Sequence, residues 1–300
     1  MYIINYHNII KEELDEFDKR LPRIDTNQFE KEIKYLSNNF QIVSTCEIIN
    51  NYSNKAINLN KVAITFDDGC YGVISNAVPI LKKYNIPASL YIITDFINKF
   101  NDNNNFDTIE IAFRISKKQK IDLSFLDFGI ISLIQTSNRV KYMKYIKRKL
   151  KLLPRNQKNE HVNKLLELLN VSFDQMKEYV HEKEKYKTLS WENVISLKKN
   201  GYEIGSHTHT HPTLSMIEQK NVTNELQLSY DLIKKNLQIS NISLAYPHGT
   251  LDHIGNIAPE IAENIGYSFA LTTIPDCIEN SKNKFMINRV TFEEFILCKK

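Results

Sequence analysis

Cysteine is scarce in this chain, and the cysteines that it has lie far apart. The 300 residues include four, at Cys46, Cys70, Cys277 and Cys298, and no two of them form a CxxC pair. This spacing argues against a thiolate zinc site and against a disulfide framework. The sequence therefore predicts free thiols in a reducing compartment.

Long apolar segments are missing as well. No segment approaches the roughly eighteen unbroken apolar residues of a membrane-spanning helix. The first residues, MYIINYHNII followed by KEELDEFDKR, lack the basic start, apolar stretch and cleavage site of a secretory signal. These absences predict a cytoplasmic protein, so any substrate must be one that is present inside the cell.

A large excess of charge of one sign is also absent. The net charge is +4, with 42% hydrophobic and 25% charged residues, and this composition is ordinary for a soluble globular domain. A mildly basic chain suits an anionic ligand but does not predict a nucleic-acid partner. The length is sufficient for one domain with a substantial core.

Short apolar, β-branched runs alternate with helical patterns in the first and last thirds of the chain. This alternation predicts βα units around a parallel sheet. We expect strands at 2–6, 62–66, 89–93, 202–206, 243–246, 269–272 and 287–291, and helices at 73–84, 191–200, 221–237 and 259–266. About seven strands favour an α/β fold of the distorted (β/α) barrel type over a small open sheet.

Residues from about 100 to 188 break this alternation. An Asn- and Asp-rich opening, NKFNDNNNFD, precedes long amphipathic stretches without a clear strand, which predicts a helical insertion within a single domain spanning 1–300. Within it, residues 139–158 carry many lysines and arginines and no acid. A solvated helix face explains such a run, and the alternative is a site for a diphosphate or a peripheral contact with an anionic membrane surface.

Two aspartates, Asp67 and Asp68, follow the predicted strand at 62–66. The strand residues VAITF suit burial, so the pair emerges from the core at the strand end where α/β barrels place their active sites. Neighbouring carboxylates repel each other unless a cation or a shared proton intervenes. The alternative is that the pair caps a helix or lies in water.

Three histidines occur within five positions of the segment SHTHTHP, directly after another predicted strand. His207 and His211 could bind one ion if the chain turns there, and a histidine-rich surface loop without metal is the alternative. Two imidazoles and one carboxylate form the open type of site that hydrolytic metals occupy. Asp67 and Asp68 could then divide the roles of base and ligand.

The ordered segments TFDDG, SHTHTHPTL and AYPHG resemble the polysaccharide deacetylase family, carbohydrate esterase family four. The resemblance covers residues 1 to about 97 and about 186 to 292, and it implies a distorted barrel of βα units. By position in these motifs it makes Asp67 the general base and Asp68, His207 and His211 the metal ligands. Zinc is the expected metal, with cobalt, nickel and manganese as alternatives.

Two parts of the family pattern are missing. An arginine is absent before Tyr246-Pro247, so Arg289 is expected to orient Asp67 unless it is an ordinary surface residue. The Leu-x-His segment that supplies the general acid is also absent, which leaves His248 and His7 as candidates, and either could instead be a structural histidine. The resemblance further implies that the backbone N–H of Tyr246 stabilises the oxyanion.

These motifs predict a metal-dependent carbohydrate N-deacetylase. We expect it to remove an acetyl group from a small nucleotide- or lipid-linked amino sugar, a precursor of a surface polysaccharide, because the assembled polymer lies outside the cell. The basic insertion would engage the phosphates. A deformylase or a cyclic-amide hydrolase on the same scaffold is one alternative. A non-catalytic, metal-containing sugar-binding protein is another, because the usual proton donor is missing.

Overall fold

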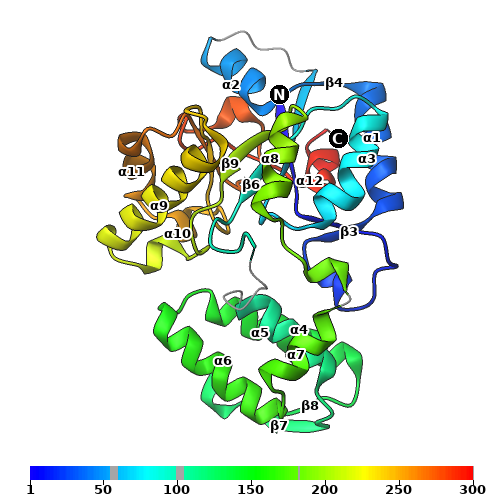
Figure 1. Cartoon of the computed structure of the whole chain (residues 1–300). Coiled ribbons are helices and arrows are strands. Elements are labelled where there is room, and N and C mark those ends of the chain that lie inside the picture. Colours follow the sequence, from blue (N-terminus) through cyan, green and yellow to red (C-terminus); the bar gives the residue numbers. More distant parts are fainter. Residues whose placement is uncertain (55–59, 99–104, 182, 300) are drawn as a thin grey trace.

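Parallel strands curl around a common axis in the computed structural model, with helices outside them (Figure 1). The structure describes residues 1–54, 60–98, 105–181 and 183–299. The strands pair in the order β1-β5-β6-β9-β10-β11, and the short β4 pairs with the start of β5. Their bounds are β1 (Tyr2–Tyr6), β4 (Gln41–Ile42), β5 (Lys61–Phe66), β6 (Ser89–Ile92), β9 (Glu203–Ser206), β10 (Leu244–Ala245) and β11 (Ala270–Leu271).

The segment that was expected to form the last strand closes the sheet. Ile287 bridges Leu271 of β11, and Val290 bridges Ile4 of β1, both in parallel register. The backbone N–H of Asn5 also donates to the Val290 carbonyl at 2.8 Å. The segment is too irregular to count as a strand, yet it lies between β11 and β1, where a seventh strand belongs. The predicted α/β barrel is confirmed.

Side chains alternate between the inside and the outside of this barrel because successive residues of a strand point to opposite faces. Ile4 and Ile64 pack in the large cluster beneath the surrounding helices. Their neighbours form a separate interior cluster that includes Ile3, Ala63, Tyr91, Ala245, Leu271 and Ile287. Residues two positions further along each strand therefore form the next interior layer, closer to the carboxyl ends of the strands.

Amphipathic helices surround the barrel. α9 buries Val222, Leu226, Ile233 and Leu237 on one face, as their spacing predicted. Asp25 caps α1 by accepting a hydrogen bond from the Gln28 N–H. The helices are α1 (Thr26–Asn39), α2 (Thr45–Ser53), α3 (Val78–Lys83), which follows the π-helical turn η2 (Val73–Ala77), α8 (Trp191–Lys199), α9 (Gln219–Leu237), α10 (Leu251–Ile254), α11 (Ala258–Ile265) and α12 (Phe292–Cys298).

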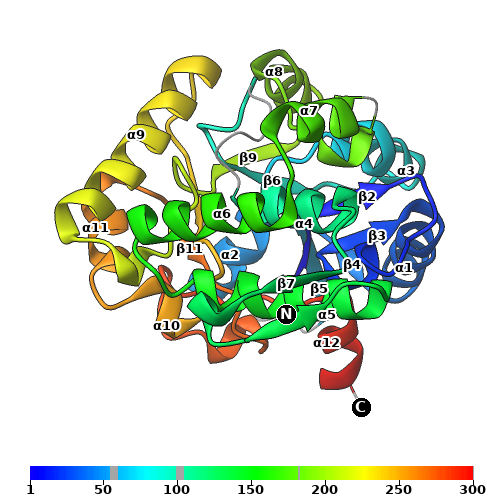
Figure 2. The same ribbon diagram turned by 90° about the horizontal axis from the view of Figure 1, so that it is seen from below.

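The predicted helical insertion lies across the carboxyl ends of the strands (Figures 1 and 2). It has its own apolar core and contains α4 (Asn105–Ile115), α5 (Thr136–Leu150), α6 (Arg155–Leu169) and α7 (Phe173–His181). The expectation of no strand was wrong, because β7 (Lys120–Asp122) and β8 (Ile130–Ser132) form a short antiparallel hairpin. Most of the Asn-rich opening lies outside the described residues, and within the described part no helix is long and apolar enough to cross a bilayer.

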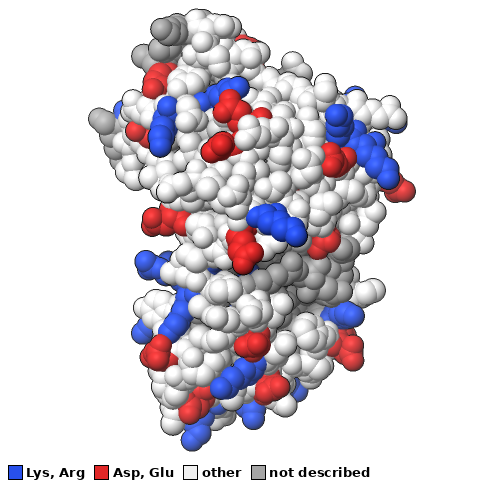
Figure 3. Space-filling view, turned by 90° about the vertical axis from the view of Figure 1, so that its left-hand side faces the viewer, with Lys and Arg blue, Asp and Glu red and all other residues white. Residues whose placement is uncertain are grey.

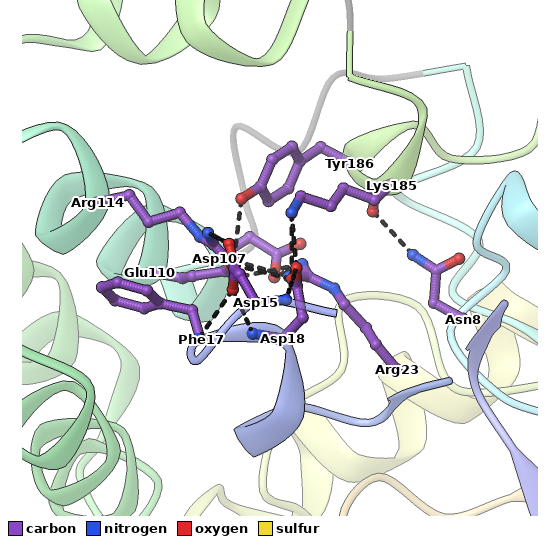
Figure 4. A network of polar contacts seen from close by, with 10 residues as sticks. All are labelled: Asn8, Asp15, Phe17, Asp18, Arg23, Asp107, Glu110, Arg114, Lys185 and Tyr186. Carbon is purple, nitrogen blue, oxygen red and sulfur yellow. Dashed lines mark hydrogen bonds and ion pairs between the residues drawn. The ribbon is translucent and has the colours of Figure 1, made fainter. Parts of the chain in front are cut away.

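A buried ionic network ties the insertion to the N-terminal part of the chain (Figure 4). Arg23, from β3 (Arg23–Asp25), contacts Glu110 of α4 at 2.7 Å and Asp18 of the 3-10 turn η1 (Asp18–Arg20) at 2.8 Å. Arg114 of α4 pairs with the same two carboxylates. Lys185, from the turn η4 (Glu184–Tyr186), approaches Asp18 at 2.9 Å. The network therefore fixes α4 against the segment that follows β1 and its short neighbour β2 (Asn8–Ile10).

Candidate functional site

Asp67 lies inside the upper end of the barrel. It follows β5 two residues after Thr65, so the alternation along the strand turns its side chain inward, and it is 1% exposed. Arg289 donates to both carboxylate oxygens, with Nη1 to Oδ1 at 2.9 Å and Nη2 to Oδ2 at 2.8 Å. The Asn5 amide donates to Oδ2 at 3.0 Å. This bidentate pair fixes the carboxylate in one orientation.

Arg289 is a buried residue, so its interpretation as an ordinary surface arginine was wrong. It is 1% exposed, and its Nε donates to the Thr272 carbonyl at 2.8 Å. Its Nη1 also contacts Asn5 and Thr65. Sequence reasoning missed Asn5 and Thr65, although a signal existed: each is a polar residue on the inward face of an apolar strand.

The surroundings keep Asp67 ionised. Burial alone would raise the pKa of its carboxyl group, but the charge of Arg289 and its hydrogen bonds hold that pKa below its usual value. A buried carboxylate that is ionised and oriented can accept a proton from a nearby water molecule.

Asp68, His207 and His211 converge beside this carboxylate. A positive φ of 73° at Asp68 and of 72° at Gly69 turns the chain directly after Asp67. Oδ1 of Asp68 lies 3.4 Å from Nε2 of His207 and 3.7 Å from Nε2 of His211. The three residues offer ligand atoms that lie within 4.8 Å of one another. Tetrahedral ligands bound at 2.0–2.2 Å are about 3.4 Å apart, so this donor set fits a single divalent metal.

Backbone contacts hold the imidazoles in ligand orientation. Nδ1 of His207 contacts the Ala245 carbonyl at 2.7 Å, and a proton on Nδ1 leaves Nε2 as a lone-pair donor toward Asp68. Thr208 and His211 have positive φ values of 66° and 58°, and the Thr208 hydroxyl accepts the His211 N–H at 3.1 Å. Burial lowers the pKa of His211 to about 3, so its ring is neutral, as metal binding requires.

The middle histidine of the motif does not join this cluster. His209 Nδ1 lies 3.0 Å from the Thr94 hydroxyl, and its backbone N–H donates to Glu225 of α9. Glu225 also accepts the N–H of Thr210 at 2.7 Å. The segment between the two ligands is therefore held by side chains outside the metal cluster.

Both candidate proton donors line the cavity above this cluster. The cavity has a volume of about 760 Å³ and is lined by His7 and His248 together with Asp67, Asp68 and His207. The ring of His248 lies 4.9 Å from that of His211, centroid to centroid. Burial lowers the pKa of His248 well below its usual value.

The predicted oxyanion role of the Tyr246 backbone was wrong. Its N–H donates to the Leu271 carbonyl at 3.0 Å, because hydrogen bonding between β10 and β11 continues one residue beyond the strand. The Tyr246 hydroxyl donates to the Phe285 carbonyl at 3.1 Å. Both polar groups of Tyr246 are thus committed to the barrel, although the residue lines the cavity.

The insertion contributes the opposite wall of the same cavity. Lys144, Lys147, Arg148 and Lys151, from α5 and the residue after it, line the cavity that contains Asp68. These residues belong to the basic run in the sequence, but only the structure shows that they face the predicted metal ligands. Of that run, the Arg155 side chain lies outside the described residues.

A parallel barrel with an Asp-His-His cluster at the carboxyl ends of its strands defines an α/β-barrel protein whose cluster could hold a metal ion, with the donor set typical of hydrolytic metals. A sequence model of the polysaccharide deacetylase family matches residues 55–118 and 155–270, which is more than half of the chain. The chain therefore belongs to the polysaccharide deacetylase family, and the resemblance is confirmed. The match extends into the insertion at both ends but omits 119–154, where α5 lies.

A local match links this chain to relatives from Staphylococcus aureus. A poly-beta-1,6-N-acetyl-D-glucosamine N-deacetylase of Staphylococcus aureus (strain MSSA476) is 37% identical over 82 residues, which are 27% of this chain and 28% of that enzyme. The chain thus matches only about a quarter of the length of this relative.

Solved structures share the fold over nearly the whole chain. A deacetylase, PplD, from Streptococcus pyogenes, solved in complex with acetate, has a TM-score of 0.62 at 17% identity, with 100% of this chain and 98% of that chain covered. IcaB from Ammonifex degensii has a TM-score of 0.57 at 15% identity, with 99% and 95% covered. At these identities the likeness shows the fold.

Proposed function

We propose that this protein removes the N-acetyl group from an amino sugar in a metal-dependent hydrolysis. One observation carries the proposal: the buried, ionised carboxylate of Asp67 is held by Arg289 and lies next to the cluster of Asp68, His207 and His211. A base kept separate from the metal ligands is what amide hydrolysis by an activated water requires.

Asp68, His207 and His211 would hold the metal, and zinc is the proposed ion. A bound divalent metal would polarise the amide carbonyl and make water more acidic. Asp67 takes the proton of the attacking water, and Arg289 keeps that carboxylate ionised and oriented. The departing amine needs a proton when the C–N bond breaks, so a proton donor must face the same cavity.

The environment of His248 favours His7 as that donor. Burial lowers the pKa of His248 well below its usual value, so its ring is neutral near pH 7. His7 directly follows β1 and lines the same cavity as Asp67 and Asp68. His248 remains the second candidate, since it also lines the cavity.

The proposed substrate is a saccharide that carries an N-acetylated amino sugar. Family membership and the name of the Staphylococcus aureus relative support this class. We also propose the finer assignment to a nucleotide- or lipid-linked sugar, which the basic wall of the cavity supports.

The test is to strip the protein of metal, reload it with zinc, cobalt, nickel or manganese, and incubate it with N-acetylglucosamine oligosaccharides and phosphate-linked N-acetylglucosamine. Free amine and acetate should appear in equal amounts. Asp67→Asn should lower kcat by about two to four orders of magnitude with the metal content unchanged. No amine from any substrate with any metal would refute the proposal, whereas formate from a formamido sugar would favour a deformylase.

A further inference from the structure

Four basic residues form a stripe along one side of α5. Lys144, Lys147, Arg148 and Lys151 are spaced at i, i+3, i+4 and i+7, so they lie on one helical face. All four line the cavity that also contains Asp68 and the two imidazole ligands. The stripe and the predicted metal site therefore face a common space.

The stripe reaches close to the metal ligands. The charge of Asp68 acts on Lys151, and the charge of Lys151 in turn lowers the pKa of His211 and His248. The Thr213 hydroxyl, two residues after His211, donates to the Lys151 carbonyl at 2.8 Å. This hydrogen bond joins the end of α5 to the loop that carries His211.

Three of these four cations are not paired with an acid. Within the described part of the chain, Lys144, Lys147 and Arg148 have no ion pair with a carboxylate within 4.0 Å. The described residues that line the cavity include eight lysines and arginines and four aspartates, and two of these cations, Arg23 and Lys185, are paired with Asp18 or Glu110 outside the lining. Of those aspartates, Asp67 is already neutralised by Arg289.

Ordinary explanations account for only part of the stripe. Basic residues near the carboxyl end of a helix interact favourably with its dipole, and surface helices often carry charge. The stripe differs from the surface drawn in Figure 3, because charges of both signs are interspersed on that surface and the stripe contains cations alone. Neither explanation gives a reason for cations to collect in a cavity beside a site for a divalent cation, where like charges oppose metal binding. An incoming anion would remove this repulsion.

We propose that the α5 stripe is an anion subsite that binds a phosphate group of the substrate next to its N-acetylated amino sugar. Lysine and arginine are the side chains best suited to phosphate oxygens. The identity of the sugar rests on the proposed function, but binding of the phosphate does not. A nucleoside diphosphate and a lipid phosphate would present the same group to the stripe.

The subsite is held in place before ligand binds. Arg139 anchors the first turn of α5 by donating to the carbonyls of Leu133, Phe113 and Ser116. On the other side of the helix, Lys149 donates to the Leu126 carbonyl at 2.9 Å. A site that is already ordered loses less entropy when a ligand binds.

The experiment compares phosphorylated and neutral sugars by calorimetry, with the metal-loaded Asp67→Asn protein so that no turnover occurs. N-acetylglucosamine 1-phosphate should bind roughly tenfold to a hundredfold more tightly than N-acetylglucosamine. Lys144→Gln combined with Arg148→Gln should abolish this preference. Lys141→Gln is the matched control, because Lys141 is exposed on the same helix and does not line the cavity.

Equal binding of the two sugars would overturn the subsite. So would a phosphate preference that survives in the double variant, because the phosphate would then lie on the metal. A UDP-linked and a polyprenyl-phosphate-linked N-acetylglucosamine, compared in the same titration, identify the source of the phosphate by the tighter binding.

The subsite and the reaction can fail separately. If the wild-type protein releases no amine but the phosphate preference is present and lost in the double variant, the deacetylase proposal fails and the subsite stands. If amine is released from neutral and phosphorylated sugars with the same KM in wild-type and double-variant proteins, the subsite fails and the reaction stands.

Discussion

The barrel and the insertion face each other across one cavity, but their charges are arranged differently. On the barrel side the buried charges are paired, with Asp67 bound by Arg289 and Asp68 close to two imidazoles. On the insertion side, Lys144 and Arg148 face the cavity without an ion-pair partner among the described residues. The paired charges of the barrel suit the chemistry that is common to a family. The unpaired cations of the insertion suit recognition of one class of substrate.

The largest effect is expected when the ion pair between Arg289 and Asp67 in the barrel is removed. Arg289→Met leaves the Asp67 carboxyl group buried without its cation, and we expect a loss of about 3–5 kcal/mol in the free energy of unfolding. In the wild type the Asp67 pKa lies below its usual value, so activity is lost only as the pH falls through that low value. Without Arg289, burial raises this pKa, and the acidic limb of the kcat/KM profile should move to higher pH.

Arg289→Lys separates charge from geometry in this experiment. It keeps a cation but cannot donate to both carboxylate oxygens at once, so an intermediate shift of the acidic limb is expected. If the folded Arg289→Met protein keeps the acidic limb of its kcat/KM profile at the wild-type pH, Arg289 does not control the pKa of Asp67.

Variants of His7 and His248 test which of these two histidines supplies the proton to the departing amine. His7→Gln should lower kcat by about two to four orders of magnitude, whereas His248→Gln should lower it by less than about tenfold. The measurement is kcat for acetate release at several pH values, with metal content determined for each variant. The opposite ranking would make His248 the donor and would place the acid beside His211.

The sequence predicted the barrel side better than the insertion side for a physical reason. Apolar, β-branched runs mark buried strands locally, and the motifs around Asp67 and His207 are contiguous in the chain. The partners of Asp67 are not local, because Asn5 and Arg289 come from opposite ends of the chain. Only the closure of the barrel brings them together. The family resemblance made Arg289 an expected partner, whereas the polar, inward-facing position of Asn5 was a signal that did not say which residue it contacts.

The wrong predictions at Tyr246 and at the β7–β8 hairpin also concern features that local sequence patterns do not specify. The Tyr246 N–H was expected to be free, but the pairing of β10 with β11 extends to it. The β7–β8 hairpin was missed because each strand has only three residues, too few for a clear alternation. The basic run of α5 was recognised, yet its direction toward the cavity depends on how the insertion packs.

The ionic network allows the insertion to be weakened without touching the metal ligands. Glu110→Ala removes one of the two carboxylates shared by Arg23 and Arg114. Asp18 still contacts both arginines, so we expect a loss of about 3 kcal/mol, at the lower end for a broken buried ion pair. Denaturant unfolding measures this loss, and calorimetry should show unchanged zinc affinity. Weaker zinc binding would mean that the barrel site depends on the insertion.

The smallest effect is expected from a single methyl group inside the barrel. A Cβ at Gly205 would lie 2.5 Å from the Tyr91 ring, and such overpacking costs about 1–3 kcal/mol. The Tyr91 ring lies 5.7 Å from Cζ of Arg289, so Gly205→Ala should also lower kcat by displacing the arginine that holds Asp67. The matched change in the insertion is Gly129→Ala, where φ is +62° but the space is open. That variant should lose about 1 kcal/mol from backbone strain alone and keep the wild-type kcat. Equal loss of activity in both variants would mean that the packing of the barrel interior does not position the base.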